Sequence, residues 1–402
     1  LVNLFFSFIM KKSLLFAALC CGLLACSEES KGLAASENTS TDTDSTVFVP
    51  VPVDYSAGRA MNKRLGRGMN LGNSWESKSY SGDVPDEPYN FGYNDNLDAG
   101  WGNPIKDEYF QLLKEAGFNS VRIPVRWQHN SDPVNHTVNP ERLAGVKEDI
   151  QLAIDAGLAV IVNFHHYKEL MVTANNSETD PAPYEAEKVH FFALWGQVAE
   201  ELNSFPDSML VLEILNEPEM KSPDLLNEVT MGAYEIIRKK APTKTIMIES
   251  YHAGKFADLD VLKLPEDGNI IFSGHYYEPY TYTHEGHGYN CVGDDSYVNS
   301  ALSDMQKYVA LAQSLYPDVN GGHVPMNLGE FGVSGQTGSC STNGPSNRSQ
   351  LLWTKKTIRA AESYDMSWHY WGFARTGGFE AYDSKTGSWL PGFLEVFQNP
   401  ND

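Results

Sequence analysis

The stretch MLVLEILNEPEM, residues 209–220, decides the fold of this chain. It is apolar over residues 209–215 apart from one glutamate, and it then changes abruptly to Asn216-Glu217-Pro218. An apolar run of this length that is ended by a proline is typical of a buried strand. Because the strand runs directly into an amide and a carboxylate, we expect its end to place reactive polar side chains at one edge of a sheet.

The same kind of run recurs seven more times, and stretches with helical periodicity separate the runs. The predicted strands are GRGMNLG (66–72), FNSVRIPV (118–125), LAVIVNFH (158–165), MLVLEILN (209–216), TIMIES (245–250), IIFSGHYY (270–277), PMNLGEF (325–331) and SWHYWGF (367–373). The predicted helices cover residues 105–116, 140–156, 184–204, 223–240, 255–263, 298–316 and 346–363, with a short one near 390–398. Eight β/α units in one run predict the α/β class and a single (β/α)8 TIM barrel.

One catalytic domain is expected over residues 56–402, because no second composition zone follows the first strand. A doubly wound open sheet is the alternative architecture. It is disfavoured because the first strand leads into NLGNSWE rather than into a glycine-rich phosphate loop.

The N-terminal region is typical of a targeting segment followed by a linker. A basic MKK start (10–12) and an apolar run too short to span a bilayer precede LLAC, which ends at Cys26. LLAC resembles the lipobox of bacterial lipoproteins, which implies a signal peptide over residues 1–26, lipidation of Cys26 and a membrane anchor. An ordinary signal peptide is the alternative. Residues 27–55 are polar and acidic, so we expect a flexible tether and an exported protein at the outer membrane or surface of a Gram-negative cell.

Charge and cysteine content limit the partners. A formal net charge of −22 repels phosphate backbones, so nucleic acid is not an expected partner. Once the signal peptide and Cys26 are set aside, only Cys291 and Cys340 remain. An oxidising compartment favours a disulfide between them, and two free thiols are the alternative.

Functional side chains of a (β/α)8 barrel lie at the C-terminal ends of its strands. The predicted strands carry or end on Arg122, His165-His166, Asn216-Glu217, His275-Tyr276-Tyr277, Glu330 and Trp371. Glu217 and Glu330 face each other across the barrel mouth in this arrangement, and a carboxylate pair is the minimal apparatus for glycoside hydrolysis. Zinc binding and a structural ion pair compete with this role, but no compact ligand motif such as HExxH is present, so no metal is expected.

Seven motifs follow one another in the order found in glycoside hydrolase family 5. They are GMNLGNSWE, WGNP, FNSVRIPVRW, NFHHY, ILNEPE, HYY and GEFG. The chain after residue 65 therefore resembles this family of retaining cellulases and related β-glycanases, which use a (β/α)8 barrel and no cofactor. Glu219 departs from the family pattern, and we expect it to tune the rim of the site without touching the reacting atoms.

The resemblance implies a role for individual positions. Glu217 would be the general acid/base and Glu330 the nucleophile, with Arg122 and Tyr277 holding the nucleophile ionised. The remaining implied substrate contacts are Asn216 to the sugar 2-hydroxyl, His275 and His165 or His166 in the same subsite, and Trp371 as its aromatic floor. Long rim segments at 74–104, 167–183, 278–297 and 332–345 offer Trp75, Trp101 and Tyr280 as candidates for stacking on pyranose faces. Asn73, just before the first of these segments, is a further expected substrate contact.

Simple electrostatics refines these roles. A neighbouring carboxylate should raise the pKa of Glu217, to about 6 in comparable sites, and Arg122 should have the opposite effect on the nucleophile. Arg122 has Glu213 as a second candidate partner, because Glu213 shares the inward parity of Glu217. Strand alternation allows only one of His165 and His166 to face the site.

The expected activity is that of a retaining endo-β-1,4-glucanase acting on cellulose or mixed-linkage β-glucan as a monomer. β-Mannanase and xyloglucanase share the barrel and the machinery and are the alternatives. A non-catalytic glycan-binding lipoprotein is a third alternative. It predicts loss of a catalytic group, whereas Glu217, Glu330, Arg122 and Tyr277 are all present.

Overall fold

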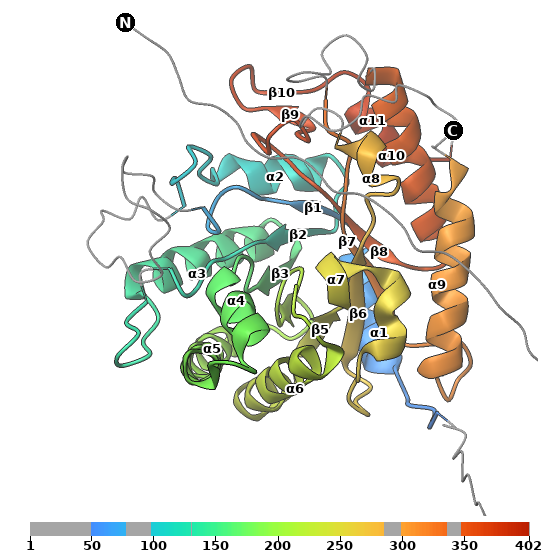
Figure 1. The fold of residues 1–402 in the computed structure, drawn as a ribbon. Coiled ribbons are helices and arrows are strands. Elements are labelled where there is room, and N and C mark those ends of the chain that lie inside the picture. Colours follow the sequence, from blue (N-terminus) through green and yellow to red (C-terminus); the bar gives the residue numbers. More distant parts are fainter. Residues whose placement is uncertain (1–49, 78–97, 130, 285–298, 336–346, 402) are drawn as a thin grey trace, which may run out of the picture. The chain divides into compact units, whose positions relative to one another are not determined.

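Eight parallel strands close into a barrel in the order in which they occur along the chain (Figure 1). The computed structural model describes residues 50–77, 98–129, 131–284, 299–335 and 347–401. The strands are β1 (Arg67–Asn70), β2 (Ser120–Ile123), β3 (Ala159–Asn163), β4 (Leu210–Glu213), β5 (Thr245–Glu249), β6 (Ile270–His275), β7 (Met326–Phe331) and β8 (Ser367–Tyr370). Each lies within a predicted strand, so the expected (β/α)8 barrel is confirmed.

Helices cover the outside of the barrel (Figure 1). Those near predicted positions are α2 (Glu108–Glu115), α3 (Pro140–Asp155), α5 (Pro181–Leu202), α6 (Pro223–Lys240), α9 (Ala301–Leu315), α10 (Asn347–Glu362) and α11 (Phe393–Gln398). Helix α3 begins where the sequence predicts, because the Asn139 side chain accepts hydrogen bonds from the backbone of Glu141 and Arg142. Within the described ranges, no helix is both long and apolar enough to cross a membrane.

A helix that the sequence analysis missed, α1 (Ser56–Leu65), packs against the interior of the barrel. The cluster it forms consists of Met61, Leu65, Ala159, Ile161, Val211, Met247 and Ile271. Just before α1, Tyr55 is buried, and the backbone N–H of Val53 donates to the carbonyl of Pro317 (3.0 Å). The last residues of the expected 27–55 tether are therefore part of the domain, because their apolar side chains pack onto it.

One prediction for a connecting segment is wrong, and one predicted helix is of a different type. Segment 167–183, expected as a rim loop, contains α4 (Lys168–Asn176), whose buried Leu170 and Ala174 are spaced four residues apart on one helical face. The helix expected at 255–263 is a 3₁₀ helix, η1 (Phe256–Val261), which follows the short α7 (Tyr251–Gly254).

Three smaller elements complete the described fold. They are α8 (Tyr280–Thr283) and a two-stranded antiparallel sheet of β9 (Tyr382–Asp383) and β10 (Ser388–Trp389). Several predictions concern residues outside the described ranges: the signal peptide (1–26), the lipidation site Cys26, and the cysteines Cys291 and Cys340. They stay predictions.

The barrel interior contains a hydrogen-bonded histidine that leaves no room at β1. His369 Nε2 lies 3.0 Å from Ser120 Oγ, and the Asn327 amide lies 3.2 Å from its Nδ1. A Cβ added at Gly68 would overlap the His369 ring and approach Ser120 Oγ to 2.7 Å. Because both partners are buried and bonded, neither can move aside freely.

We predict that Gly68→Ala destabilises the protein by about 1–3 kcal/mol through overpacking. Urea or thermal unfolding measures the effect. The matched control is Gly196→Ala in α5, where the nearest atom would be Ile236 Cγ2 at an ordinary 3.7 Å. There alanine should stabilise the helix by about 0.5–1 kcal/mol. Equal stability of Gly68→Ala and the wild type would contradict the packing described.

Candidate active site

The guanidinium of Arg122 organises the site from the interior of the barrel. It is fully buried on β2, and it donates from Nε and Nη2 to the two carboxylate oxygens of Glu213, each at 2.7 Å. Nη1 donates to Glu330 Oε1 (2.6 Å) and to Asn70 Oδ1 (3.0 Å), and Nη2 donates to Asn216 Oδ1 (2.6 Å). These five bonds use the five N–H donors of an arginine. Arg122 therefore binds both of its candidate partners, Glu213 and the predicted nucleophile Glu330, at the same time.

Glu330, on β7, is fixed through both carboxylate oxygens. Arg122 holds Oε1, and the Tyr277 hydroxyl donates to Oε2 (3.1 Å). The side chain is 6% exposed. Charge and orientation therefore suit a nucleophile whose attacking oxygen must stay in one place.

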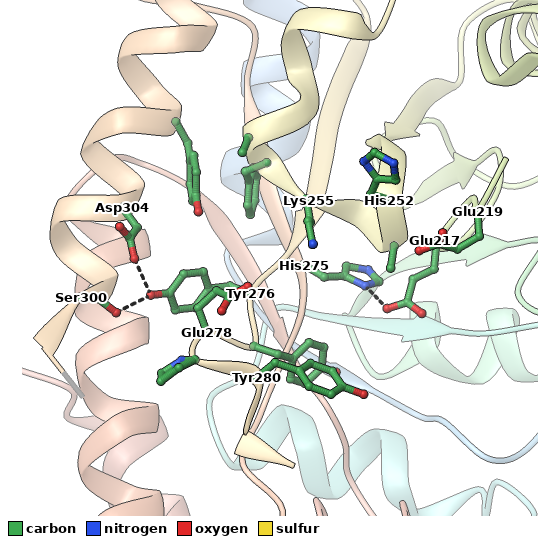
Figure 2. Close-up of a pocket in the computed structure, with 16 residues that line it drawn as sticks. Glu217, Glu219, His252, Lys255, His275, Tyr276, Glu278, Tyr280, Ser300 and Asp304 are labelled. Atoms are coloured by element: carbon green, nitrogen blue, oxygen red, sulfur yellow. Dashed lines mark hydrogen bonds and ion pairs between the residues drawn. The ribbon is translucent and has the colours of Figure 1, made fainter. Parts of the chain in front are cut away.

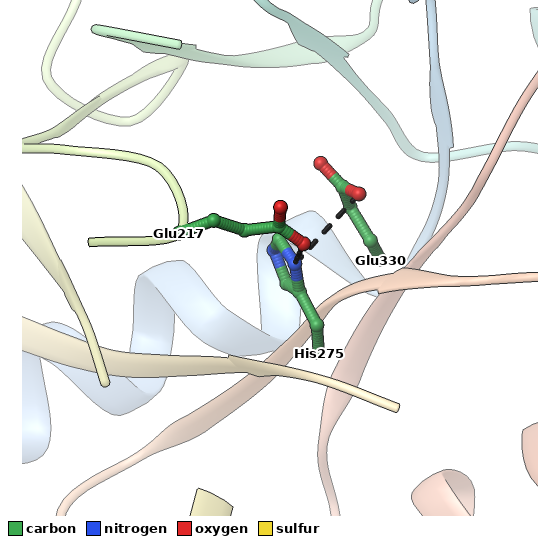
Figure 3. A group of neighbouring side chains, drawn as sticks. All are labelled: Glu217, His275 and Glu330. Atoms are coloured by element: carbon green, nitrogen blue, oxygen red, sulfur yellow. Dashed lines mark hydrogen bonds and ion pairs between the residues drawn. The ribbon is translucent and has the colours of Figure 1, made fainter. Parts of the chain in front are cut away.

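Glu217 follows β4 and points back over the barrel mouth toward Glu330 (Figure 3). Its backbone has φ 45, a left-handed conformation uncommon outside glycine. Its Oε1 lies 2.8 Å from His275 Nδ1, and its side chain is 37% exposed. One ligand atom each of Glu217, His275 and Glu330 lie within 4.8 Å of one another.

The pKa values differ from the sequence expectation because His275 is charged. Burial alone would lower the pKa of His275, but the carboxylates of Glu249, Glu330 and Glu217 raise it to about 10. Burial would raise the pKa of Glu217, yet the hydrogen bond and charge of His275 hold that pKa below its ordinary value. Burial raises the pKa of Glu330, and His275 and Arg122 oppose this shift without cancelling it. Arg122 thus lowers the pKa of Glu330 as predicted. Burial outweighs it, so that pKa lies above its ordinary value rather than below it.

An aromatic wall stands beside the carboxylates. Trp371, after β8, lies parallel to the His165 ring, with centroids 5.7 Å apart and an interplanar angle of 4°. His166 contacts His165 (4.5 Å) and Trp101 (6.1 Å). Because β3 ends at Asn163, strand alternation does not apply to the two histidines, and both join this wall. The expectation that only one could do so is wrong.

Asn73 and Trp75, both in the segment after β1, differ in exposure. Asn73 is partly exposed, and its amide donates to the carbonyl of Arg375 (3.0 Å). Trp75 is 5% exposed, and its indole N–H donates to Asp149 Oδ2 on α3 (2.6 Å). The prediction that Trp75 stacks on a sugar is wrong, because its ring is buried against α3.

A pocket of about 790 Å³ opens beside Glu217, against the residues that follow β5 and β6 (Figure 2). Its walls include Glu219, His252, Lys255 and Tyr280. Glu219 is exposed there, so it lies on the rim as expected. The pocket offers space on the acid/base side of the carboxylate pair.

Sequence reasoning missed two polar groups of the site, Asn70 and Glu249. Asn70 accepts from Arg122 and donates to the carbonyl of Gly329 (3.0 Å). Glu249 accepts the backbone N–H of Glu217 (2.9 Å). A signal for Glu249 was present in TIMIES, where an apolar strand again ends on a carboxylate.

Glu217, His275 and Glu330 also have the spacing of three metal ligands. The arrangement favours proton chemistry instead. Arg122 already places a positive charge 2.6 Å from Glu330, and Glu217 and His275 are bonded to each other. A cation among them would have to compete with a buried guanidinium.

A closed barrel that holds two carboxylates this near each other at the ends of β4 and β7 has the geometry of a retaining glycoside hydrolase. Residues 83–376 match the family model described as Cellulase (glycosyl hydrolase family 5). The chain belongs to glycosyl hydrolase family 5.

Known relatives and solved structures resemble this chain over most of its length. It is 28% identical to Endoglucanase A of Clostridium longisporum over 358 residues, 83% of this chain but 63% of that protein. A hyperthermophilic endo-β-1,4-glucanase solved with substrate is 31% identical, with a TM-score of 0.69 over 85% of this chain and 99% of that one. Thermotoga maritima Cel5A solved with mannotriose is 30% identical, with a TM-score of 0.67 and the same coverage.

We predict that His275→Ala moves the alkaline limb of the kcat/KM profile to higher pH by about 1 unit or more. The imidazolium lowers the pKa of Glu217, so without it burial raises that pKa and the acid keeps its proton at higher pH. His252→Ala is the control, because this exposed histidine pairs with Asp258 (2.9 Å) and lies on the pocket wall. It should leave the limb in place. An unmoved or acid-shifted limb in His275→Ala would contradict the assignment.

Proposed function

We propose that this protein is a retaining endo-β-1,4-glucanase that hydrolyses internal bonds of cellulose or mixed-linkage β-glucan. The observation that carries the proposal is the carboxylate pair. One member is clamped by Arg122 and Tyr277, and the other is partly exposed and bonded to His275. One oxygen of each carboxylate lies within 4.8 Å of the other, which favours the carboxyl separation of about 5–5.5 Å in retaining enzymes over the about 6.5–9.5 Å of inverting ones.

In the first step, a carboxylate oxygen of Glu330 attacks the anomeric carbon while Glu217 gives its proton to the glycosidic oxygen. The bond to the leaving sugar breaks, and an ester to Glu330 forms. Arg122 and Tyr277 keep the nucleophile aimed as its charge is consumed. Asn216, held by Arg122, is placed to bind the sugar 2-hydroxyl.

In the second step, Glu217 removes a proton from water, and the resulting hydroxide attacks the anomeric carbon and releases Glu330. The proton that Glu217 lost in the first step is thereby recovered. Because the ester has no charge, one carboxylate repelling Glu217 has gone, which favours its ionised, basic form. Two displacements give net retention.

Glucan specificity is supported by the related enzymes. The Clostridium longisporum relative and the hyperthermophilic structure are both named as endoglucanases. β-Mannanase activity is the second candidate, because a similar barrel has been solved with mannotriose. The partly exposed ring of Trp371 can stack on either sugar.

We predict that the protein releases oligosaccharides from carboxymethylcellulose and barley β-glucan, with the β-anomer formed first in ¹H NMR. Glu330→Ala should lose activity by about 10³-fold or more, because no covalent intermediate can form. Xyloglucan and glucomannan, assayed alongside, test the alternatives. Greater activity on glucomannan would overturn the glucan assignment, an initial α-anomer would overturn retention, and an active Glu330→Ala would overturn the mechanism.

We also propose that the chain is exported, lipidated at Cys26 and anchored in a Gram-negative membrane, with Cys291 and Cys340 bonded. The support is the sequence: MKK, a short apolar run, LLAC and a polar linker. Labelled palmitate should enter the wild-type protein but not Cys26→Ser. Cys20→Ser is the control and should label normally. Equal labelling of Cys26→Ser would contradict the lipobox.

A further inference from the structure

Glu249 is a third carboxylate in the site, behind the catalytic pair. It ends β5 and is 2% exposed. Met247, two residues earlier, lies in the cluster of the barrel interior, and residues i and i+2 of a strand share a face. Glu249 therefore enters the barrel by strand parity, like Glu213 on β4.

The contacts of Glu249 converge on the acid/base. Its Oε1 accepts the backbone N–H of Glu217 (2.9 Å) and lies 3.5 Å from His275 Nε2. Within the described ranges, His275 Nε2 has no hydrogen-bond partner, so this carboxyl is what its buried N–H faces. On its other side, Glu249 Oε2 lies 3.9 Å from Arg122 Nη2. One side chain thus contacts both the backbone of Glu217 and the ring that binds its carboxylate.

The chain after β5 is shaped to leave room for this side chain. His252, Ala253 and Gly254 all have positive φ, of 47, 58 and 74. A Cβ on Gly254 would overlap Oε1 of Glu249 and come within 3.2 Å of the His275 ring. Two consecutive non-glycine residues in the left-handed region are strained, and such strain persists where the surrounding structure requires it.

The charges around Glu249 favour its protonated form. It is faced by Glu213 and Glu217 from β4 and the segment after it, by Arg122 from β2 and by His275 from β6. Burial, reinforced by the two glutamates, raises the pKa of Glu249 well above its ordinary value, although His275 and Arg122 oppose the shift.

We propose that Glu249 is a positioning residue for the general acid, acting through the Glu217 backbone and the His275 ring. This inference rests on the proposed retaining mechanism. Oε1 fixes the strained peptide from which the Glu217 side chain projects and orients His275 so that Nδ1 meets the Glu217 carboxyl. The Glu217 carboxyl is thereby held where the leaving oxygen needs its proton.

Dependence on the leaving group tests this role, because only a poor leaving group needs protonation. The measurement is kcat/KM at fixed pH on cellotetraose and on 2,4-dinitrophenyl β-cellobioside, whose phenolate leaves unassisted. We expect Glu249→Ala to lose about 10–100-fold on cellotetraose, part of the about 10²–10⁴-fold that general acid catalysis supplies. On the dinitrophenyl substrate it should lose less than about 3-fold, since Glu330 and its supports are intact.

Two further variants separate positioning from general damage. Glu249→Gln keeps an oxygen that can accept the Glu217 N–H, so it should stay within about 3-fold of wild type on both substrates. Asp149→Ala removes a buried carboxyl on α3 that accepts from the Trp75 indole, and it should change kcat/KM on both substrates by the same factor.

Three results would overturn the inference. One is equal loss on both substrates in folded Glu249→Ala. Another is no loss on cellotetraose. The third applies if Glu249→Ala does not fold: a loss above about 10-fold on cellotetraose in Glu249→Gln, which keeps the accepting oxygen, would contradict a role through that oxygen. Failure of the proposed function is distinguishable, because the wild type would then cleave neither substrate.

Discussion

The five hydrogen bonds of Arg122 are the interaction on which the rest of the site depends. A buried cation is costly unless its partners satisfy it, and loss of one partner leaves an uncompensated charge. Glu213 supplies a bidentate carboxylate that takes no part in the reaction. Because that pairing anchors the guanidinium independently, Nη1 stays in place while Glu330 gains and loses its charge during turnover. Nη2 at the same time holds Asn216 where the substrate binds.

Strand parity explains how an apolar barrel ends in a polar site. On each of three strands, an inward-facing residue of the cluster packed on α1 is followed two residues later by an inward-facing polar residue. The pairs are Ile161 and Asn163 on β3, Val211 and Glu213 on β4, and Met247 and Glu249 on β5. The apolar residues form one layer inside the barrel, next to α1, and the polar groups form the next layer toward the site. The layer that stabilises the barrel by burial is therefore separate from the layer whose buried charges are costly. The rigid layer also fixes the distances between groups on different strands.

The fold and the two carboxylates were predictable because both rest on local patterns. An apolar run ending on a polar group marks a strand end wherever it occurs, and this located Glu217, His275 and Glu330, whereas Arg122 lies inside its strand. Errors arose where three-dimensional context decides. Trp75 has the composition of a sugar platform, but α3 covers it. The pKa of Glu217 depends on an imidazolium that only the folded site brings to 2.8 Å, and no spacing in the sequence encodes that distance.

The charge balance of the site shows why a general acid exists there at all. Four carboxylates, Glu213, Glu217, Glu249 and Glu330, surround two cationic groups, Arg122 and His275. Four negative charges in so small a buried volume cannot be balanced by two positive ones, so protons are retained. Glu213 is committed to Arg122 and Glu217 is bonded to His275, whereas burial raises the pKa values of Glu249 and Glu330. Glu217 is the most exposed of the four, so its carboxyl is the one placed to exchange a proton with a substrate.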